Sequence, residues 1–340
     1  MDTTLLRQLY KINSKSGIED DMQDFIMSYI EQREGLPNVP KCTMDMDKRG
    51  NILVTSGEAD TYPCICAHMD EVHPAILDKE VIEYKDFMFC FSPSRMGVVG
   101  CGADDKNGIF IALKALDVLP AVKLLFTVEE EIGAVGAYNV NTKKWLKNVR
   151  YVIQCDRRGS DDFVTSISGI KLASKEFKKD AGTILKGYGF NETTGMLTDV
   201  MALKEEGLRV SCCNLSCGYY TPHSDREVTY LPHLEKTFNA VMEICLTLTK
   251  TYQHNYEKPV YKKYSGAAIT SANAYGNRKY LNLETEAAYL TLIARSEGGN
   301  VPLNPESYVC QDCLKLNCDY CAYSVPSHTN YSKDWDNRYY

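Results

Sequence analysis

The stretch Ile65-Cys66-Ala67-His68-Met69-Asp70-Glu71-Val72 joins an apolar run to polar side chains at its end. The apolar run begins at Tyr62, and a run of this length is typical of a strand buried on both faces. Because side chains alternate along a strand, His68 and Asp70 should share a face, where the carboxylate can accept the second ring N–H of the histidine. The stretch therefore predicts a strand-end histidine that is oriented to bind a metal ion.

The segments around this strand alternate between apolar runs and helical patterns. Helices are predicted at 3–34 (two of them), 107–119, 170–186, 198–206 and 231–250, with a short one after Gly133. Strands are predicted in a hairpin over 42–57, in a pair over 79–91, and at 122–128, 149–155 and 208–215. Most strands are apolar throughout, which indicates an α/β fold whose mixed, mostly parallel sheet is sandwiched by helices.

The composition indicates a soluble protein with a large core and an appendage. The chain has 340 residues, 44% of them hydrophobic, and a formal net charge of -7, which favours solubility and argues against a nucleic-acid partner. Neither a signal peptide nor a membrane-spanning apolar segment is recognisable, so a cytoplasmic location without membrane contact is expected. The composition shifts after Lys250, which predicts a main domain over 1–250 and a small Cys-rich C-terminal extension over 251–340.

Each predicted strand of the sheet leads to a histidine or a carboxylate. Ligands of an open α/β sheet bind at the carboxyl ends of the strands, so these side chains should gather at one edge. The candidates are His68, Asp70, Asp104, Asp105, Glu129, Glu130, Glu131, Asp156 and His223. Two histidines with several acids suit transition metals, and the acids are too many for one zinc ion. Two ions, roughly 3.5–4 Å apart in known pairs, would absorb the charge and suit hydrolysis.

Five short motifs carry a family resemblance. They are AHMDEV (67–72), GADDKNG (102–108), EEEIG (129–133), QCDRRG (154–159) and YYTPHSD (219–225). In order and type they resemble the co-catalytic di-zinc exopeptidases, above all the peptidase T-like tripeptidases and the zinc aminopeptidases. The resemblance covers residues 1–250, which would then be the catalytic domain with the zinc exopeptidase fold.

The resemblance implies a metal ligand in each motif. The ligands would be His68, Asp104, Glu131, Asp156 and His223. One histidine would bind each ion, and Asp104 would bridge both. A cis peptide bond between Asp104 and Asp105 is implied as well.

The resemblance also implies two residues with catalytic roles. Glu130 would be the general base, and Asp70 would orient His68. Counting back from Gly133 in the EEEIG motif assigns Glu131 as the ligand and Glu130 as the base. A shift by one residue, to Glu130 and Glu129, is the alternative.

One feature of the peptidase T-like relatives is expected to be missing. These relatives insert a dimerisation lid between the fourth and fifth metal ligands. Here the interval from Asp156 to His223 already holds two predicted helices and a strand of the sheet. Without a lid, the tripeptide specificity and the oligomeric state stay open.

The function implied is a metal-dependent exopeptidase that hydrolyses short peptides through a hydroxide bridging two metal ions. The two divalent ions would be zinc, with cobalt or manganese as alternatives that the same ligands admit. A first rival is an amidohydrolase or deacylase that acts on acylated amino acids with the same site. A second rival is a catalytically inactive binding or scaffolding module.

Some polar residues near the motifs have simpler interpretations. Asp105 is expected to cap the helix that begins near Asn107 rather than to bind metal. Thr198 and Asp199 are expected to form a helix N-cap, with contact to a substrate ammonium as the alternative. Tyr219 and Tyr220 are expected either to pack in the core or to reach the substrate, one of them as an oxyanion donor.

The fourteen cysteines fall into two groups. Those before residue 251 lie mostly in apolar runs, so they are interpreted as reduced, buried side chains. The late group is Cys310, Cys313, Cys318 and Cys321, two Cys-x2-Cys pairs separated by a short gap. It predicts one further, structural zinc ion, with free thiols or redox pairs as the alternative.

Overall fold

The structure is a computed structural model that describes residues 1–33, 35–37 and 39–257. The late cysteine group and nearly all of the predicted extension lie outside these residues. At the start of the predicted extension, Tyr252 is buried and packs against the rings of Tyr151 and Phe177, with ring centroids 6.0 and 5.2 Å away. The chain therefore remains part of the core just beyond Lys250, and the domain boundary stays a prediction.

The main sheet has the order β1-β2-β7-β3-β8-β12-β9-β10, with β11 paired to β9. Its strands are β1 (Cys42–Met46), β2 (Ile52–Ser56), β3 (Tyr62–His68), β7 (Val122–Thr127), β8 (Val149–Arg157), β9 (Asp162–Ile167), β10 (Ile170–Lys171), β11 (Asn191–Gly195) and β12 (Cys212–Ser216). The four central strands β7, β3, β8 and β12 are parallel, whereas β1, β2, β9 and β10 join antiparallel. The predicted mixed, mostly parallel sheet is confirmed.

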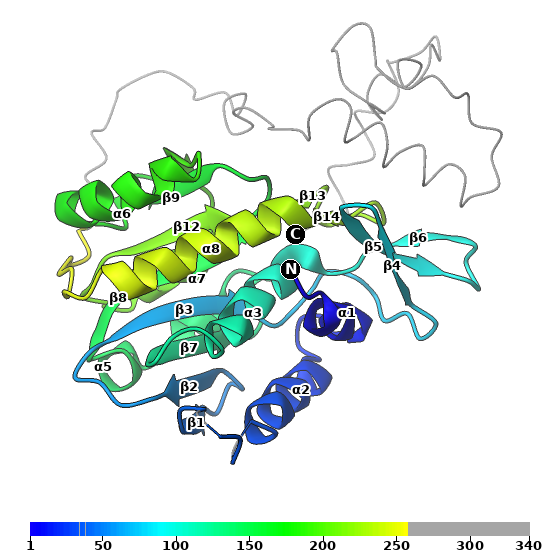
Figure 1. Ribbon diagram of the computed structural model, residues 1–340, viewed down its shortest axis with the longest axis horizontal. Coiled ribbons are helices and arrows are strands. Elements are labelled where there is room, and N and C mark those ends of the chain that lie inside the picture. Colours follow the sequence, from blue (N-terminus) through cyan, green and yellow to red (C-terminus); the bar gives the residue numbers. More distant parts are fainter. Residues whose placement is uncertain (34, 38, 258–340) are drawn as a thin grey trace, which may run out of the picture. The chain divides into compact units, whose positions relative to one another are not determined.

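Helices cover both faces of this sheet. They are α1 (Thr4–Lys11), α2 (Asp20–Glu31), α3 (Ala103–Ala115), α4 (Val135–Asn139), α5 (Thr142–Trp145), α6 (Lys175–Gly187), α7 (Asp199–Glu205) and α8 (Leu231–Thr247). Figure 1 shows α3 and α8 running across one face. Side chains of β3 alternate between two apolar clusters: Ile65 packs with α3 and α8, and Cys66 packs with α4 and α7. This alternation explains why β3 is apolar throughout.

A second, antiparallel sheet adjoins the carboxyl end of the first. It consists of β13 (Tyr219–Tyr220), β14 (Val228–Tyr230), β5 (Phe87–Ser92) and β4 (Glu80–Tyr84), with β6 (Gly97–Val99) paired to β5. The strands β4 and β5 are the pair predicted around the turn at Lys85, whose φ is 53°. Because β13 and β14 flank the His223 loop, this sheet fixes both ends of that loop.

Between Asp156 and His223 the structure differs from the prediction in detail. The helix predicted from residue 170 begins only at Lys175, because Ser174 caps it by accepting a hydrogen bond from the N–H of Phe177 (3.1 Å). The strands β9 and β11 were not predicted. β11 is a mostly exposed edge strand, so it lacks the apolar run that reveals a buried strand. Strands of the main sheet, helices α6 and α7, and the short strand β13 of the second sheet lie in this interval, which leaves it no separate lid domain.

Two smaller differences concern the ends of elements. Helix α3 begins at Ala103, although its first residues, Asp104 and Asp105, have non-helical backbone angles. Strand β12 begins at Cys212 rather than at residue 208. Among the described helices, none has the length and apolar character that crossing a membrane would require.

Candidate metal centre

The predicted ligands come from elements that end at one edge of the main sheet. His68 is the last residue of β3, Glu131 follows β7, and Asp156 lies at the end of β8. Asp104 stands at the start of α3, and His223 lies in the loop between β13 and β14. The neighbouring strands β7, β3 and β8 run parallel, so their carboxyl ends bring the first three side chains together.

Asp104 lies between two groups of side chains. Its Oδ1 is 3.3 Å from Nε2 of His68, which is also 3.7 Å from Oδ1 of Asp156. Its Oδ2 is 3.3 Å from Nε2 of His223, which is 3.0 Å from Oε2 of Glu131. In each group the candidate ligand atoms lie within 4.8 Å of one another. The structure thus brings all five predicted residues together, with one carboxylate shared by both groups.

The residues of the two groups fit a pair of divalent ions. Each group offers one imidazole nitrogen and carboxylate oxygens, the donors that zinc takes in catalytic sites. Oε1 of Glu131 is buried and has no hydrogen-bond partner, which a bound cation would supply. His68 is fully buried, whereas the side chain of His223 is 51% exposed. The site is therefore open to solvent on the His223 side.

Protons compensate the clustered charge of the metal-free site. Burial raises the pKa of Asp156 to about 7, helped by the nearby charge of Asp104. Burial also raises the pKa of Glu131. Hydrogen bonds to Asp104 and Glu131 raise the pKa of His223 to about 11. Burial would lower the pKa of His68, but hydrogen bonds to Asp104, Asp156 and Asp70 raise it well above its usual range. Two cations would replace these protons.

Asp70 lies behind His68, as the strand-end pattern predicts. Nδ1 of His68 lies 3.0 Å from the backbone oxygen of Asp70 and 3.3 Å from its Oδ1, so the other ring nitrogen faces the ligand groups. The Asp70 carboxylate also accepts hydrogen bonds from the backbone N–H groups of Glu130 (2.9 Å) and Glu131 (3.1 Å) and from Oγ of Ser16 (2.7 Å). Asp70 therefore connects the first ligand to the loop that carries the next one.

The three acids after β7 point to different partners. Glu129, with φ of 54°, pairs with Arg49, whose Nε lies 2.7 Å from its Oε2, and it stands outside the ligand groups. Glu131 contacts His223. Burial raises the pKa of Glu130 well above its usual range, and the charges of Asp156, Asp199 and Glu131 act in the same direction. The geometry favours the assignment to Glu130 and Glu131 over the shift by one residue.

The backbone around Asp104 agrees with two further expectations. The peptide bond between Asp104 and Asp105 is cis. Oδ1 of Asp105 accepts a hydrogen bond from the N–H of Gly108 (3.0 Å), which is the predicted cap of the helix. Its Oδ2 also accepts from the backbone N–H of His68 (3.3 Å), so Asp105 links α3 to the end of β3.

A buried polar network beneath Asp156 was missed by the sequence reasoning. Thr198 stands at the N-cap position of α7, but its hydroxyl donates to Oδ2 of Asp156 (2.7 Å) or to Gln154 instead of capping the helix. The amide of Gln154 donates to Oδ2 of Asp156 and to Oδ2 of Asp199, both at 3.1 Å. An amide inside the apolar strand β8 is the signal that could have revealed this network.

The two tyrosines before His223 take separate positions. The hydroxyl of the buried Tyr219 donates to Oδ1 of Asp156 at 3.3 Å, so it belongs to the site. The hydroxyl of Tyr220 lies 2.6 Å from Nδ1 of His233, away from the ligand groups.

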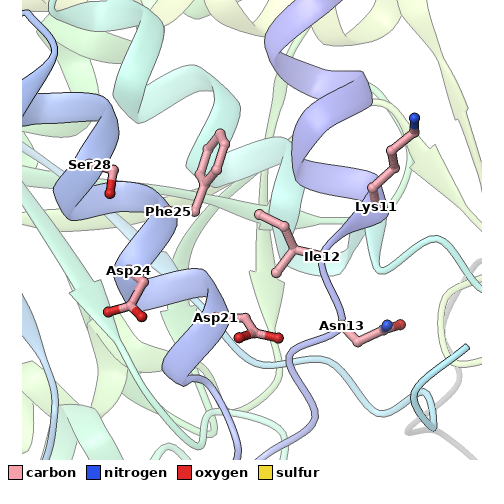
Figure 2. A pocket seen from close by; sticks show the side chains of 7 residues that line it. All are labelled: Lys11, Ile12, Asn13, Asp21, Asp24, Phe25 and Ser28. Atoms are coloured by element: carbon pink, nitrogen blue, oxygen red, sulfur yellow. The ribbon is translucent and has the colours of Figure 1, made fainter. Parts of the chain in front are cut away.

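A surface pocket of about 470 Å³ lies between the C-terminal end of α1 and helix α2. Figure 2 shows its lining side chains, which include Lys11, Asn13, Asp21, Asp24 and Phe25. It contains none of the ligand residues, so it is separate from the metal centre.

Known structures share this fold at low sequence identity. An aminopeptidase PepT from Bacillus cereus is 13% identical, covers 71% of this chain and 97% of its own, and has a TM-score of 0.58. A tripeptidase from Staphylococcus aureus is 14% identical, with 71% and 96% covered and a TM-score of 0.56. An aminopeptidase from the archaeon Desulfurococcus kamchatkensis is 16% identical, with 71% and 93% covered and a TM-score of 0.55.

No curated protein matches the chain by sequence. The model of peptidase family M28, however, matches residues 51–226, a span of more than half the chain that contains every predicted ligand. Peptidases of this family depend on metal ions. The chain therefore belongs to peptidase family M28 and is a hydrolase of peptide bonds.

Proposed function

We propose that the chain is a two-metal exopeptidase that removes residues from the free amino terminus of short peptides. The shared carboxylate of Asp104 carries this proposal. One of its oxygens faces a group with His68 and Asp156, and the other faces a group with His223 and Glu131. Such a bridge between two one-histidine groups suits a co-catalytic pair of ions better than a single ion.

In this proposal, His68, Asp156 and Asp104 hold one ion, and His223, Glu131 and Asp104 hold the other. When bound, the two ions supply Lewis-acid polarisation of the scissile carbonyl and a hydroxide nucleophile at neutral pH. Zinc is the proposed metal, and cobalt or manganese would fit the same nitrogen and oxygen donors.

Glu130 moves the proton in the proposed reaction. Its carboxylate accepts a proton from the attacking water and passes it to the nitrogen of the leaving amine. Burial supports this role, because a raised pKa brings a carboxyl closer to the neutral pH at which a general base works best. The backbone N–H bond of Glu130 to Asp70 keeps the base next to the ligand groups.

The substrate proposal draws on the solved structures that share the fold. Two of them are described as aminopeptidases and one as a tripeptidase. The exposed side chain of His223 leaves one side of the site open, so an extended peptide end can approach it.

A panel of four substrates tests the function on the zinc-loaded full chain. The panel contains a free tripeptide, its N-acetylated form, its C-amidated form and an N-acyl amino acid. We expect release of the first residue from the free and the amidated peptide, and no cleavage of the acetylated one. Cleavage of the acyl amino acid alone would identify a deacylase. No cleavage of any substrate by protein that holds two ions would favour a binding module.

A further inference from the structure

We propose that Glu227 is a positioning residue that holds the backbone beneath Asp104 and thereby couples the two metal-binding groups. The proposal rests on the two-metal function above. Glu227 is 1% exposed and lies four residues after His223, but it belongs to neither ligand group. Its role would be to keep the shared carboxylate facing both ions.

Both carboxylate oxygens of Glu227 contact the segment that leads to Asp104. Oε2 accepts a hydrogen bond from the N–H of Gly102 at 2.6 Å, and Oε1 accepts one from the N–H of Asp104 at 3.1 Å. The thiol of Cys101 lies 3.7 Å from Oε2 and 3.6 Å from the backbone oxygen of Glu227. One side chain thus fixes the backbone on both sides of Ala103, immediately before the shared ligand.

The same residue belongs to the loop that carries His223. The N–H of Glu227 donates to the backbone oxygen of Ser224 at 3.1 Å, which closes the turn after the histidine. The next residue begins β14, which pairs with β5 and β13. At the top of the loop, Nε2 of His223 lies 3.3 Å from Oδ2 of Asp104. The Asp104 segment and the His223 loop are therefore connected twice. The side chains of Asp104 and His223 make one connection, and the carboxylate of Glu227 makes the other by binding the backbone N–H groups of Gly102 and Asp104.

The packing leaves this segment little freedom to shift. A Cβ atom on Gly102, whose φ is 65°, would lie 2.1 Å from Oε2 of Glu71, and one on Gly100 would lie 2.1 Å from Cε1 of His73. Nζ of Lys106 lies 2.9 Å from Glu71 and compensates its charge. Nε2 of His73 lies 3.1 Å from Oε2 of Glu227. Glu71 thus packs closely against the segment, and Glu227 is the carboxylate bonded to the amides next to the ligand.

The chemistry of these contacts requires a carboxylate. The hydrogen-bonding neighbours of Glu227 on this segment are donors, and a carboxylate accepts on both oxygens. A glutamine has nearly the same shape, but its amide group would face an N–H of Gly102 or of Asp104. Glu227→Gln therefore keeps the volume of the side chain and breaks at least one contact to the backbone beneath the shared ligand.

Metal titration of the full chain tests the proposal. Cobalt(II) is added to metal-free wild type and to Glu227→Gln, and binding is followed by calorimetry and by the visible spectrum of the bound ion. We expect affinity about 10- to 100-fold lower in the variant, the range found when partners behind metal ligands are removed. We also expect an altered cobalt spectrum. In addition, the two sites should bind cobalt one after the other in the variant instead of cooperatively. Glu192→Gln, on the exposed strand β11, is the control with unchanged binding.

Three outcomes would overturn the proposal. A folded Glu227→Gln variant with wild-type affinity and spectrum would remove the positioning role while leaving the two-metal function intact. If that variant does not fold, Glu227→Asp, which keeps the charge on a shorter side chain, takes its place in the same test. It should lower the cobalt affinity by a smaller factor, and wild-type affinity would again remove the positioning role. Failure of both variants to fold would assign Glu227 a purely structural role. A wild type that binds no cobalt would instead refute the proposed function itself.

Discussion

The Asp70 carboxylate accepts a hydrogen bond from the backbone N–H of Glu130, with 2.9 Å between Oδ1 and the nitrogen. The same carboxylate accepts from the N–H of Glu131 and lies against the ring of His68. A single side chain thus orients a proposed ligand on β3 and holds the loop that carries the proposed base. The spacing of His68 and Asp70 predicts the contact between these two side chains. The contact of Asp70 with the Glu130–Glu131 loop depends on the pairing of β3 with β7.

We predict that Asp70→Asn weakens metal binding about 10- to 100-fold. The amide would face either an N–H of the Glu130–Glu131 loop or the Nδ1–H of His68, so at least one of these contacts is lost. Zinc titration of the metal-free protein measures the effect. Ser16→Ala is the matched control, because it removes only one of the donors to Asp70 and should cost less. Wild-type affinity in Asp70→Asn would contradict the orienting role.

The neighbouring acids Glu129, Glu130 and Glu131 form an internal comparison. We expect Glu130→Gln to lower kcat by about 10²- to 10⁴-fold, the usual contribution of a general base, with its metal content unchanged. Glu131→Gln should lose metal, because it removes a contact of the His223 group. Glu129→Gln should remain close to wild type, since this side chain pairs with Arg49. Assays of kcat alongside elemental analysis separate the three, and a fully active Glu130→Gln would refute the assigned base.

The gathering of three candidate ligands could be predicted from the strands, because His68, Glu131 and Asp156 stand at or just after the carboxyl ends of parallel strands. A residue at the end of a buried parallel strand reaches the shared edge of the sheet, so His68 and Asp156 were both expected there. In the structure, Nε2 of His68 lies 3.7 Å from Oδ1 of Asp156. The choice among Glu129, Glu130 and Glu131 came from the family motif. The structure supplies a physical reason, since Arg49 on the β1–β2 turn draws Glu129 away.

Apart from Asp70, the residues behind the ligands could not be predicted in the same way. Gln154, Thr198 and Glu227 contact Asp199, Asp156 and the segment before Asp104, respectively, and each of these partners lies far away in the chain. Only burial gives them a role, because a buried polar group requires a partner. Strand β11 was not predicted because it is a mostly exposed edge strand and has no apolar pattern.

Tyr219 and Tyr220 offer a test of which tyrosine serves the site. Tyr219→Phe removes a donor to Oδ1 of Asp156, and we expect metal affinity to fall about tenfold, which corresponds to about 1.4 kcal/mol for a hydrogen bond to a charged group. Tyr220→Phe removes a contact to His233 and should leave metal binding unchanged. Calorimetric titration measures both. A loss of kcat without any loss of affinity in Tyr219→Phe would instead support an oxyanion donor.

The raised pKa values predict how the metal-free protein responds to pH. Burial raises the pKa of Asp156 to about 7 and of Asp199 to about 6, from an ordinary value of 3.8. Both carboxyls therefore hold protons more tightly in the folded than in the unfolded chain. Their contribution to the free energy of unfolding is complete below about pH 4 and is lost as the pH rises to about 7. His223, with its pKa raised to about 11, loses its contribution between about pH 6.5 and 11.

Metal-loaded protein should behave differently, because bound ions replace the protons. We expect the difference in Tm between zinc-loaded and chelator-treated protein to widen as the pH rises from about 5 to about 8. Thermal unfolding at several pH values measures it. Asp199→Asn should flatten the response of the metal-free protein, because it removes one of the titrating carboxyls. Metal-free protein that gains stability over this range would contradict the raised pKa values.

The late cysteines make a separate prediction about metal content. If Cys310, Cys313, Cys318 and Cys321 bind zinc, the full chain should hold one ion more than the proposed catalytic pair. Replacing Cys310 and Cys313 together by serine should remove that ion and leave peptide hydrolysis intact, because a four-thiolate site has no open position for substrate. Elemental analysis with a titration of accessible thiols measures both states. Equal zinc content in wild type and variant, with four reactive thiols in the wild type, would instead identify the cysteines as free. That result would leave the metal centre at the strand ends unaffected, since none of its proposed ligands is a cysteine.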